Sequence, residues 1–224
     1  MTSLRFDYSG IGDSSLRTDC LSYEQSVIDE TGLFLDYLQN TQGFTEFVLI
    51  GICSGADNAL RVAVQDKRVI GCVAIDPLTK PTLTFYWRTY LRRAISLQSW
   101  KNLVRGRSDI IKKLQKAKDV QNTPDDIELS RPEDFSTVEA LSALKSILER
   151  NARVCLVYSG GVSYYNYLGN YKHEFHSLQK NDNFTLIFFK RANHTFTLLY
   201  NQQILMQAIA EWLSFVTDNS HEGL

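Results

Sequence analysis

One short stretch of this 224-residue chain has the residue types and spacing of a site for nucleophilic chemistry. An apolar run over residues 47–50 leads into Gly51-Ile52-Cys53-Ser54-Gly55, and a helix-like segment follows. A nucleophile placed between two small residues at a strand-to-helix bend is held in a strained conformation on a sharp turn. Counting from Gly51 and Gly55 makes Cys53 the central residue. We expect glycine at both flanking positions because the turn is tight.

Ser54 follows the candidate nucleophile directly, and its backbone N–H would help to stabilise an oxyanion. Centring the motif on Ser54 instead would put Ile52 at a position that needs a small residue. The alternative to a nucleophile is an ordinary Gly-rich turn of an α/β protein, with Cys53 as a buried thiol.

A histidine that could activate Cys53 lies far along the chain. His194 belongs to the loop 192–196, which follows a predicted strand over 184–189 and precedes the last predicted helix. In that position its imidazole would take the proton of the thiol. The alternative for His194 is a structural role, whereas His173, His176 and His221 lie in polar or terminal segments.

The third member of a catalytic triad, an acid that orients the histidine, has no obvious candidate. The turn after the predicted strand 153–158 reads Ser159-Gly160-Gly161-Val162-Ser163 and contains no acid. Asp76, at the end of the preceding strand, is a substitute, and its alternative role is to cap the turn before Pro77. Weaker alternatives are Glu174 and Asp182. A cysteine, with a pKa near ~8.5, needs the acid less than a serine does.

Apolar patterning predicts the elements that would position these residues. Strands are expected over residues 3–8, 44–50, 69–75, 153–158 and 184–189. Helices are expected over 22–39, 56–66 and 136–150, and a final amphipathic helix carries the apolar residues between 204 and 216. Strands and helices that alternate at this spacing predict a mostly parallel sheet with helices on both faces.

The composition is that of a soluble globular protein, with 44% hydrophobic and 22% charged residues and a net charge of −1. No apolar run approaches the roughly 20 residues that a membrane span needs, and no signal-peptide pattern opens the chain. The four cysteines lack the C-x-x-C spacing typical of zinc sites. These features predict a cytoplasmic protein without a transmembrane segment, metal or cofactor.

The charges are distributed unevenly. Residues 80–118 contain eleven Lys or Arg and one acid, interleaved with aromatic residues. We expect residues 80–135 to form a basic helical lid and linker, and residues 1–79 and 136–224 to form the core. The predicted substrate-binding residues are Trp87, Arg92, Arg93 and Trp100. A positive surface there would attract an anionic substrate, carrier or membrane surface, and the alternative is solvated helix faces. No recognised motif for binding nucleic acid is present.

Three stretches carry a resemblance to a known superfamily that covers nearly the whole chain. Residues 4–14 resemble the R-F-D-x-x-G-x-G-x-S stretch of serine-aminopeptidase-like and esterase-like α/β-hydrolases, and residues 192–196 resemble the histidine loop of that fold. Residues 88–93 and 99–106 are similar to the lid of hydrolases associated with exosortase and exopolysaccharide gene clusters. In those hydrolases the residue at the centre of the strand-to-helix bend is often a cysteine. The resemblance implies an α/β-hydrolase fold that lacks its first three strands and the loop that supplies a second oxyanion N–H group.

The resemblance also implies a function. The chain is expected to be an esterase- or thioesterase-type hydrolase or acyltransferase that acts through Cys53 and His194 on an acylated small molecule or carbohydrate. The alternative is a catalytically impaired remnant of the fold that acts as a binding or scaffold protein. The sequence is also compatible with a homo-oligomer of this chain.

Overall fold

The computed structural model describes residues 2–77, 137–161 and 168–220 of the chain. The chain divides into two units, Met1–Lys80 with Asp134–Leu224, and Pro81–Glu133. The second unit, where the basic lid and its four substrate-binding residues are predicted, lies outside the described residues. The domain boundaries at 80 and 135 therefore remain a prediction.

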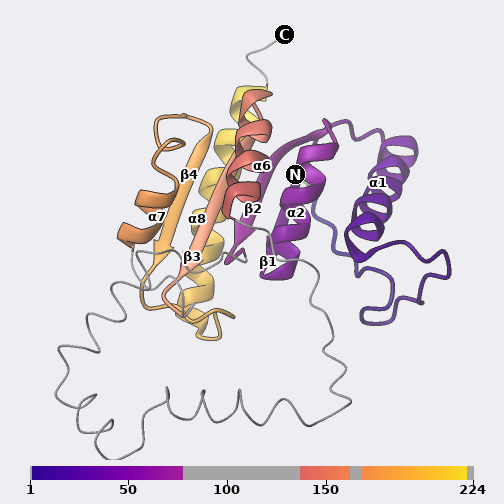
Figure 1. Ribbon diagram of the computed structural model, residues 1–224, viewed down its shortest axis with the longest axis horizontal. Coiled ribbons are helices and arrows are strands. Elements are labelled where there is room, and N and C mark those ends of the chain that lie inside the picture. The colour runs from indigo at the N-terminus through magenta and orange to yellow at the C-terminus, as the bar shows by residue number, and fades with distance from the viewer. Residues whose placement is uncertain (1, 78–136, 162–167, 221–224) are drawn as a thin grey trace, which may run out of the picture. The chain divides into compact units, whose positions relative to one another are not determined.

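The described part of the first unit is built on a parallel sheet in which the order β1-β2-β3-β4 is also the order along the chain (Figure 1). The strands are β1 (Phe47–Ile52), β2 (Val69–Ile75), β3 (Arg153–Ser159) and β4 (Phe184–Phe189). Their register pairs Ile52 with Ile75, Ile75 with Val157, and Val157 with Ile187. The carboxyl ends of all four strands therefore meet at one edge of the sheet.

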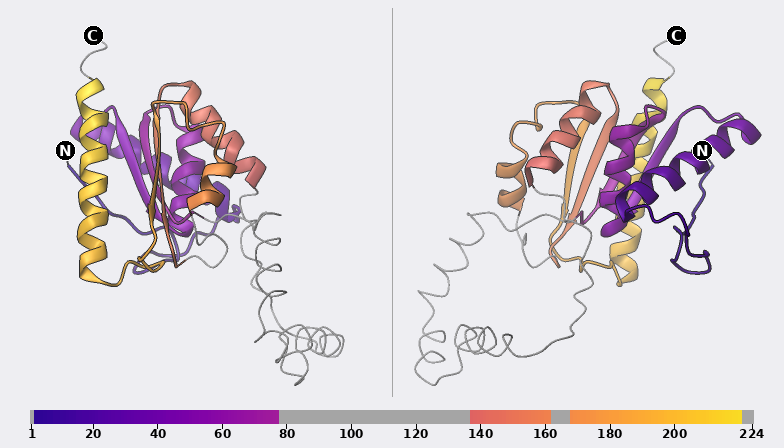
Figure 2. Two further views of the ribbon diagram at one scale, coloured as in Figure 1. Left: turned by 90° about the vertical axis from the view of Figure 1, so that its left-hand side faces the viewer. Right: turned by 45° about the vertical axis from the view of Figure 1, so that its right-hand side comes forward.

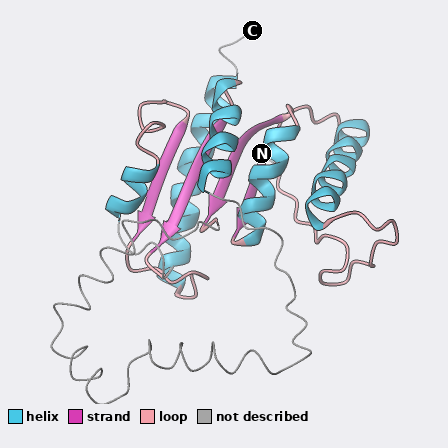
Figure 3. Cartoon of the chain, in the orientation of Figure 1, coloured by secondary structure: helices cyan, strands magenta, loops and turns pink. Residues whose placement is uncertain are grey.

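Helices cover both faces of this sheet, which confirms the predicted α/β architecture. The described helices are α1 (Tyr23–Gln42), α2 (Ser54–Gln65), α6 (Thr137–Glu149), α7 (Leu168–Glu174) and α8 (Leu199–Ser220). Helix α8 covers one face, and α2 and α6 pack on the other (Figure 2). Figure 3 shows the alternation of strand and helix along the chain.

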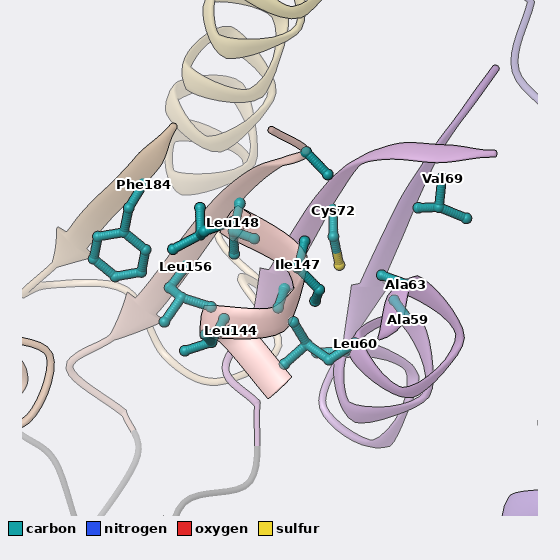
Figure 4. Packing of buried hydrophobic residues seen from close by; sticks show 14 of the residues in the cluster. Ala59, Leu60, Ala63, Val69, Cys72, Leu144, Ile147, Leu148, Leu156 and Phe184 are labelled. Atoms are coloured by element: carbon teal, nitrogen blue, oxygen red, sulfur yellow. The ribbon is translucent and has the colours of Figure 1, made fainter. Parts of the chain in front are cut away.

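Alternate residues of the central strands enter two separate hydrophobic cores. Cys72 of β2 and Leu156 of β3 pack with Leu60 of α2 and Ile147 of α6 (Figure 4). Their neighbours along the strands, Val73, Cys155 and Val157, face α8 and pack with Trp212 and Val216. A strand covered on both faces must be apolar at every position, which explains the continuous hydrophobic runs of β2 and β3.

Most predicted elements are present, with bounds that shift by a few residues at their ends. Strands β2 and β4 have the predicted bounds, whereas the final helix is longer than its apolar stripe and extends over Leu199–Ser220. Helix α7 was not expected from the sequence. The strand predicted over residues 3–8 is wrong, because that segment is an irregular coil whose Leu4 is exposed.

Polar contacts hold the N-terminal segment against α1 where a strand ladder was expected. The Tyr8 hydroxyl lies 3.1 Å from the Thr31 hydroxyl, and the Ser9 N–H donates to the Glu30 carboxylate at 2.8 Å. Further along the segment, Arg17 forms ion pairs with Glu30 and with two aspartates, Asp19 and Asp29. Side-chain contacts to α1 have therefore replaced backbone pairing with the sheet.

Strand β1 lies at one edge of the sheet and pairs with β2 alone among the described strands. Its Ile50 and Ile52 side chains are exposed, while Leu49 packs against the core on the α2 side.

None of the helices in the described segments combines the length and apolar character that a bilayer crossing requires.

The two glycines of the motif prove to have different roles, which a pair of substitutions would measure. A Cβ at Gly51 would overlap the Gly55 carbonyl, whereas a Cβ at Gly55 would meet no atom within 4 Å, so the sequence expectation holds for Gly51 alone. We expect Gly51→Ala to lower the free energy of unfolding by about 2–3 kcal/mol, because packed backbone must move. Gly55→Ala should leave it unchanged or raise it by up to ~1 kcal/mol, since alanine favours the helix. Urea unfolding followed by circular dichroism measures both, and equal effects would contradict this account.

Candidate active site

The hydrogen-bond ladder of the sheet continues one residue past three strand ends and thereby positions the candidate site. Cys53 N–H donates to the Ile75 carbonyl at 2.8 Å, and Asp76 N–H donates to the Val157 carbonyl at 2.7 Å. Gly160 N–H donates in turn to the Phe189 carbonyl at 3.0 Å. The first residues after β1, β2 and β3 are therefore neighbours at the carboxyl edge, although they are far apart in sequence.

Cys53 sits on the bend between β1 and α2 in a strained backbone conformation. Its φ is 56° and its ψ is −124°, a region that residues with a side chain rarely adopt. Its carbonyl accepts the N–H of Ala56 at 2.9 Å and of Asp57 at 3.3 Å, which closes the first turn of α2. Cys53 is partly exposed, as a nucleophile on this turn must be.

Ser54 is the first residue of α2, as the oxyanion prediction requires. The first N–H groups of a helix have no acceptor within the helix, and they carry the positive end of its dipole. A negative charge that develops beside Cys53 would therefore be stabilised by the Ser54 N–H.

Asp76 is a buried carboxylate, and its backbone also has a positive φ of 46°. One of its oxygens, Oδ1, accepts the Ser159 N–H at 2.6 Å. The other, Oδ2, accepts the Ser159 hydroxyl at 2.6 Å and lies 3.0 Å from Nδ1 of His194. Three donors around a carboxylate with 0% side-chain exposure compensate for its removal from water.

His194 is held between two buried anchors in the loop after β4. Ala192 and Phe196 both pack into the core on the α8 side. The Asn193 side chain closes the loop, because its oxygen accepts the Thr197 N–H at 3.0 Å and its amide donates to the Thr197 hydroxyl at 2.8 Å. The imidazole itself remains 39% exposed.

The contact with Asp76 decides which nitrogen of His194 carries the proton in the neutral ring. A carboxylate oxygen only accepts hydrogen bonds, so Nδ1 must be the donor to Asp76. The other nitrogen, Nε2, is then the free base. Among the described residues, the ring is hydrogen-bonded to Asp76, and no such bond joins it to the Cys53 thiol. Catalytic contacts of this kind are often long without substrate and shorten when it binds.

The structure brings Asp76, which the sequence offered ahead of Glu174 and Asp182, to His194. Asp182 is exposed, and Glu174 lies on α7. Ser159, which binds Asp76 twice, was missed as a site residue, although the absence of an acid at that turn was the available signal. In the described segments no group of three or more His, Cys, Asp or Glu side chains could hold a metal ion.

Gly160 and Gly161, the two residues that follow β3, lie against backbone and leave no space for a side chain. A Cβ at Gly160 would overlap the Lys190 carbonyl, and a Cβ at Gly161 would lie 2.6 Å from the backbone nitrogen of His194. These glycines let the histidine loop pack directly on the turn.

Several solved structures match the chain over most of its length. An esterase of Pyrococcus furiosus superposes with a TM-score of 0.58 at 16% identity, over 95% of this chain and 69% of that protein. The α/β-hydrolase GrgF of Penicillium sp. sh18 superposes with a TM-score of 0.52 at 16% identity, over 95% of this chain and 78% of its own. A protein of unknown function from Agrobacterium tumefaciens gives 0.52 at 13% identity, over 96% and 70%. No family model and no curated protein matches the chain.

The chain has the α/β-hydrolase fold. In the α/β-hydrolase fold the nucleophile, the acid and the histidine follow one another in that order along the chain. Cys53, Asp76 and His194 have this order, and each lies just beyond a strand of the sheet. The acid differs from the expected pattern in its place, because it follows β2 and not β3.

We expect thiol reactivity to distinguish Cys53 from the core cysteines. Burial raises the pKa of both the Cys72 and the Cys155 thiol to about 12. We expect iodoacetamide at pH 7.5, with peptide mapping by mass spectrometry, to label Cys53 at least ~100-fold faster than either, because only the thiolate reacts. Exposed Cys20 reports the rate of a freely accessible thiol. Equal labelling of Cys53, Cys72 and Cys155 in the folded protein would exclude the nucleophile.

Proposed function

We propose that this chain is an α/β-hydrolase of the esterase or thioesterase type that transfers an acyl group through Cys53. One observation carries the proposal: the Asp76–His194 hydrogen bond lies at the same sheet edge as a cysteine held at positive φ on a strand-to-helix bend. Nucleophilic catalysis requires a base that an acid orients and a nucleophile that the base can reach, and the shared sheet edge supports this arrangement.

The reaction proceeds in two halves. Nε2 of His194 accepts the thiol proton while the sulfur of Cys53 attacks the carbonyl carbon of an ester or thioester. The carbonyl oxygen becomes an oxyanion, which the Ser54 N–H stabilises. The tetrahedral intermediate then expels the alcohol or thiol, which takes the proton from His194, and leaves an acyl thioester on Cys53.

Water or another acceptor completes the cycle. His194 removes its proton as it attacks the thioester carbonyl, and the sulfur leaves and recovers a proton from the imidazole. Water yields a carboxylic acid, so the chain acts as a hydrolase, whereas an alcohol yields a new ester and makes it an acyltransferase. Asp76 keeps Nδ1 protonated throughout and stabilises the imidazolium that forms in each half.

The substrate we propose is an acylated small molecule or carbohydrate. The basic composition of residues 80–118 would favour one that carries an anionic group. The chemistry of the two halves uses only this chain's own groups and requires no cofactor.

Substitution of the two reacting side chains tests the mechanism. We expect Cys53→Ala and His194→Ala each to lower the rate of p-nitrophenyl acetate hydrolysis by at least ~100-fold, because each removes a group that the proton transfer needs. The exposed residues Cys20 and His176 provide matched controls, and Cys20→Ala and His176→Ala should keep the full rate. A Cys53 or His194 variant that keeps the wild-type rate would overturn the dyad.

A second substitution tests which acid acts. Asp76→Asn removes the negative charge that holds Nδ1–H, and we expect it to lower kcat by about 10²-fold. It should also lower the free energy of unfolding by about 1–3 kcal/mol, because a buried donor of Ser159 loses a charged acceptor. Asp182→Asn, on the exposed alternative acid, should change neither quantity. Loss of activity in Asp182→Asn with a normal Asp76→Asn would reverse the assignment.

A further inference from the structure

We propose that Ser159 is a positioning residue that locks the carboxylate of Asp76 in the orientation that His194 requires. Its consequence for turnover rests on the proposed acyl-transfer function, but the positioning itself does not. Ser159 is the last residue of β3 and has 0% exposure, so water cannot replace its donors.

The argument begins with the ladder between β2 and β3. The register pairs Ile75 with Val157, and Asp76 N–H donates to the Val157 carbonyl. In a regular parallel ladder the Ser159 N–H would next donate to the backbone carbonyl of Asp76. It donates instead to the side-chain Oδ1 of Asp76 at 2.6 Å.

The positive φ of Asp76 accompanies this replacement of its backbone carbonyl by its side-chain carboxylate as the hydrogen-bond acceptor. At 46° it departs from the extended conformation that continues a strand, and the carboxylate takes the place of the next ladder acceptor. The backbone N–H of the neighbouring strand therefore holds one carboxylate oxygen in the ladder.

The Ser159 hydroxyl adds a second contact from the same residue. It donates to Oδ2 at 2.6 Å, so the two donors of Ser159 hold both oxygens of one carboxylate. A carboxylate held at both oxygens cannot rotate about its terminal bond, whose torsion is otherwise broad. This contact directs Oδ2 toward Nδ1 of His194, 3.0 Å away.

Two substitutions separate hydrogen bonding from packing. Ser159→Ala removes the hydroxyl donor and keeps the backbone donor. Ser159→Cys nearly keeps the side-chain volume, but its S–H is a weak donor. If the hydroxyl positions Asp76, the cysteine variant behaves like the alanine variant. If the side chain only fills space, the cysteine variant behaves like wild type.

The primary readout is the Nδ1 proton of His194, observed by proton NMR in protein labelled with ¹⁵N-histidine and assigned by its loss in His194→Ala. We expect a sharp downfield signal in wild type, and a shifted signal at least about twofold broader in Ser159→Ala and Ser159→Cys. Ser142→Ala, on the exposed side of α6, should leave it unchanged. An unchanged signal in Ser159→Ala, or a wild-type signal in Ser159→Cys alone, would overturn the proposal. If one variant does not fold, the other still decides, because both must lose the wild-type signal.

Kinetics provide the second readout. With p-nitrophenyl acetate we expect kcat to fall about 10- to 100-fold in both Ser159 variants while KM stays within about twofold, because orientation and not binding is lost. A rise in KM as large as the fall in kcat would contradict a positioning role. If wild type does not turn over the ester, the proposed function fails, and the NMR signal still tests the role of Ser159 independently.

Discussion

The candidate site depends on a ladder of parallel hydrogen bonds that continues past the ends of the strands. Without the bonds from Cys53 to Ile75 and from Asp76 to Val157, the residues after β1 and β2 would diverge into separate loops. Parallel pairing also gives all four strands the same direction, so that their carboxyl ends converge on one edge. The same backbone interaction that stabilises the sheet therefore brings together groups that are more than a hundred residues apart.

Two residues of the site depart from favourable backbone geometry, and both lie where a strand ends. Cys53 and Asp76 have positive φ values of 56° and 46°. Such conformations cost about 1–3 kcal/mol each and persist only where the surrounding contacts determine them. At Cys53 the first turn of α2 and the close approach of Gly51 provide those contacts. At Asp76 the buried carboxylate provides them, because relaxing the backbone would break its hydrogen bonds with Ser159 and His194.

Local patterns in the sequence predicted the features that depend on neighbouring residues alone, namely strands and the bend at Cys53. Apolar runs identified β2 and β4, and the spacing of small residues identified the bend at Cys53. Segment 3–8 has strand-like residues, but Tyr8 and the neighbouring Ser9 bind α1, a tertiary preference that patterning does not encode. Asp76 was only the first of three candidate acids, since its role depends on contact with a histidine 118 positions away. Ser159 was missed because its role exists only through the register of two strands.

The position of the acid and the glycines of the next turn are two parts of one arrangement. Gly161 approaches the backbone of His194 so closely that a side chain there would push the loop away from the sheet. With the loop this close, the imidazole reaches one strand further, to the carboxylate that follows β2. The two donors of Ser159 and the Nδ1–H of His194 surround this buried carboxylate, so the contacts that orient the imidazole also compensate for the removal of the carboxylate from water.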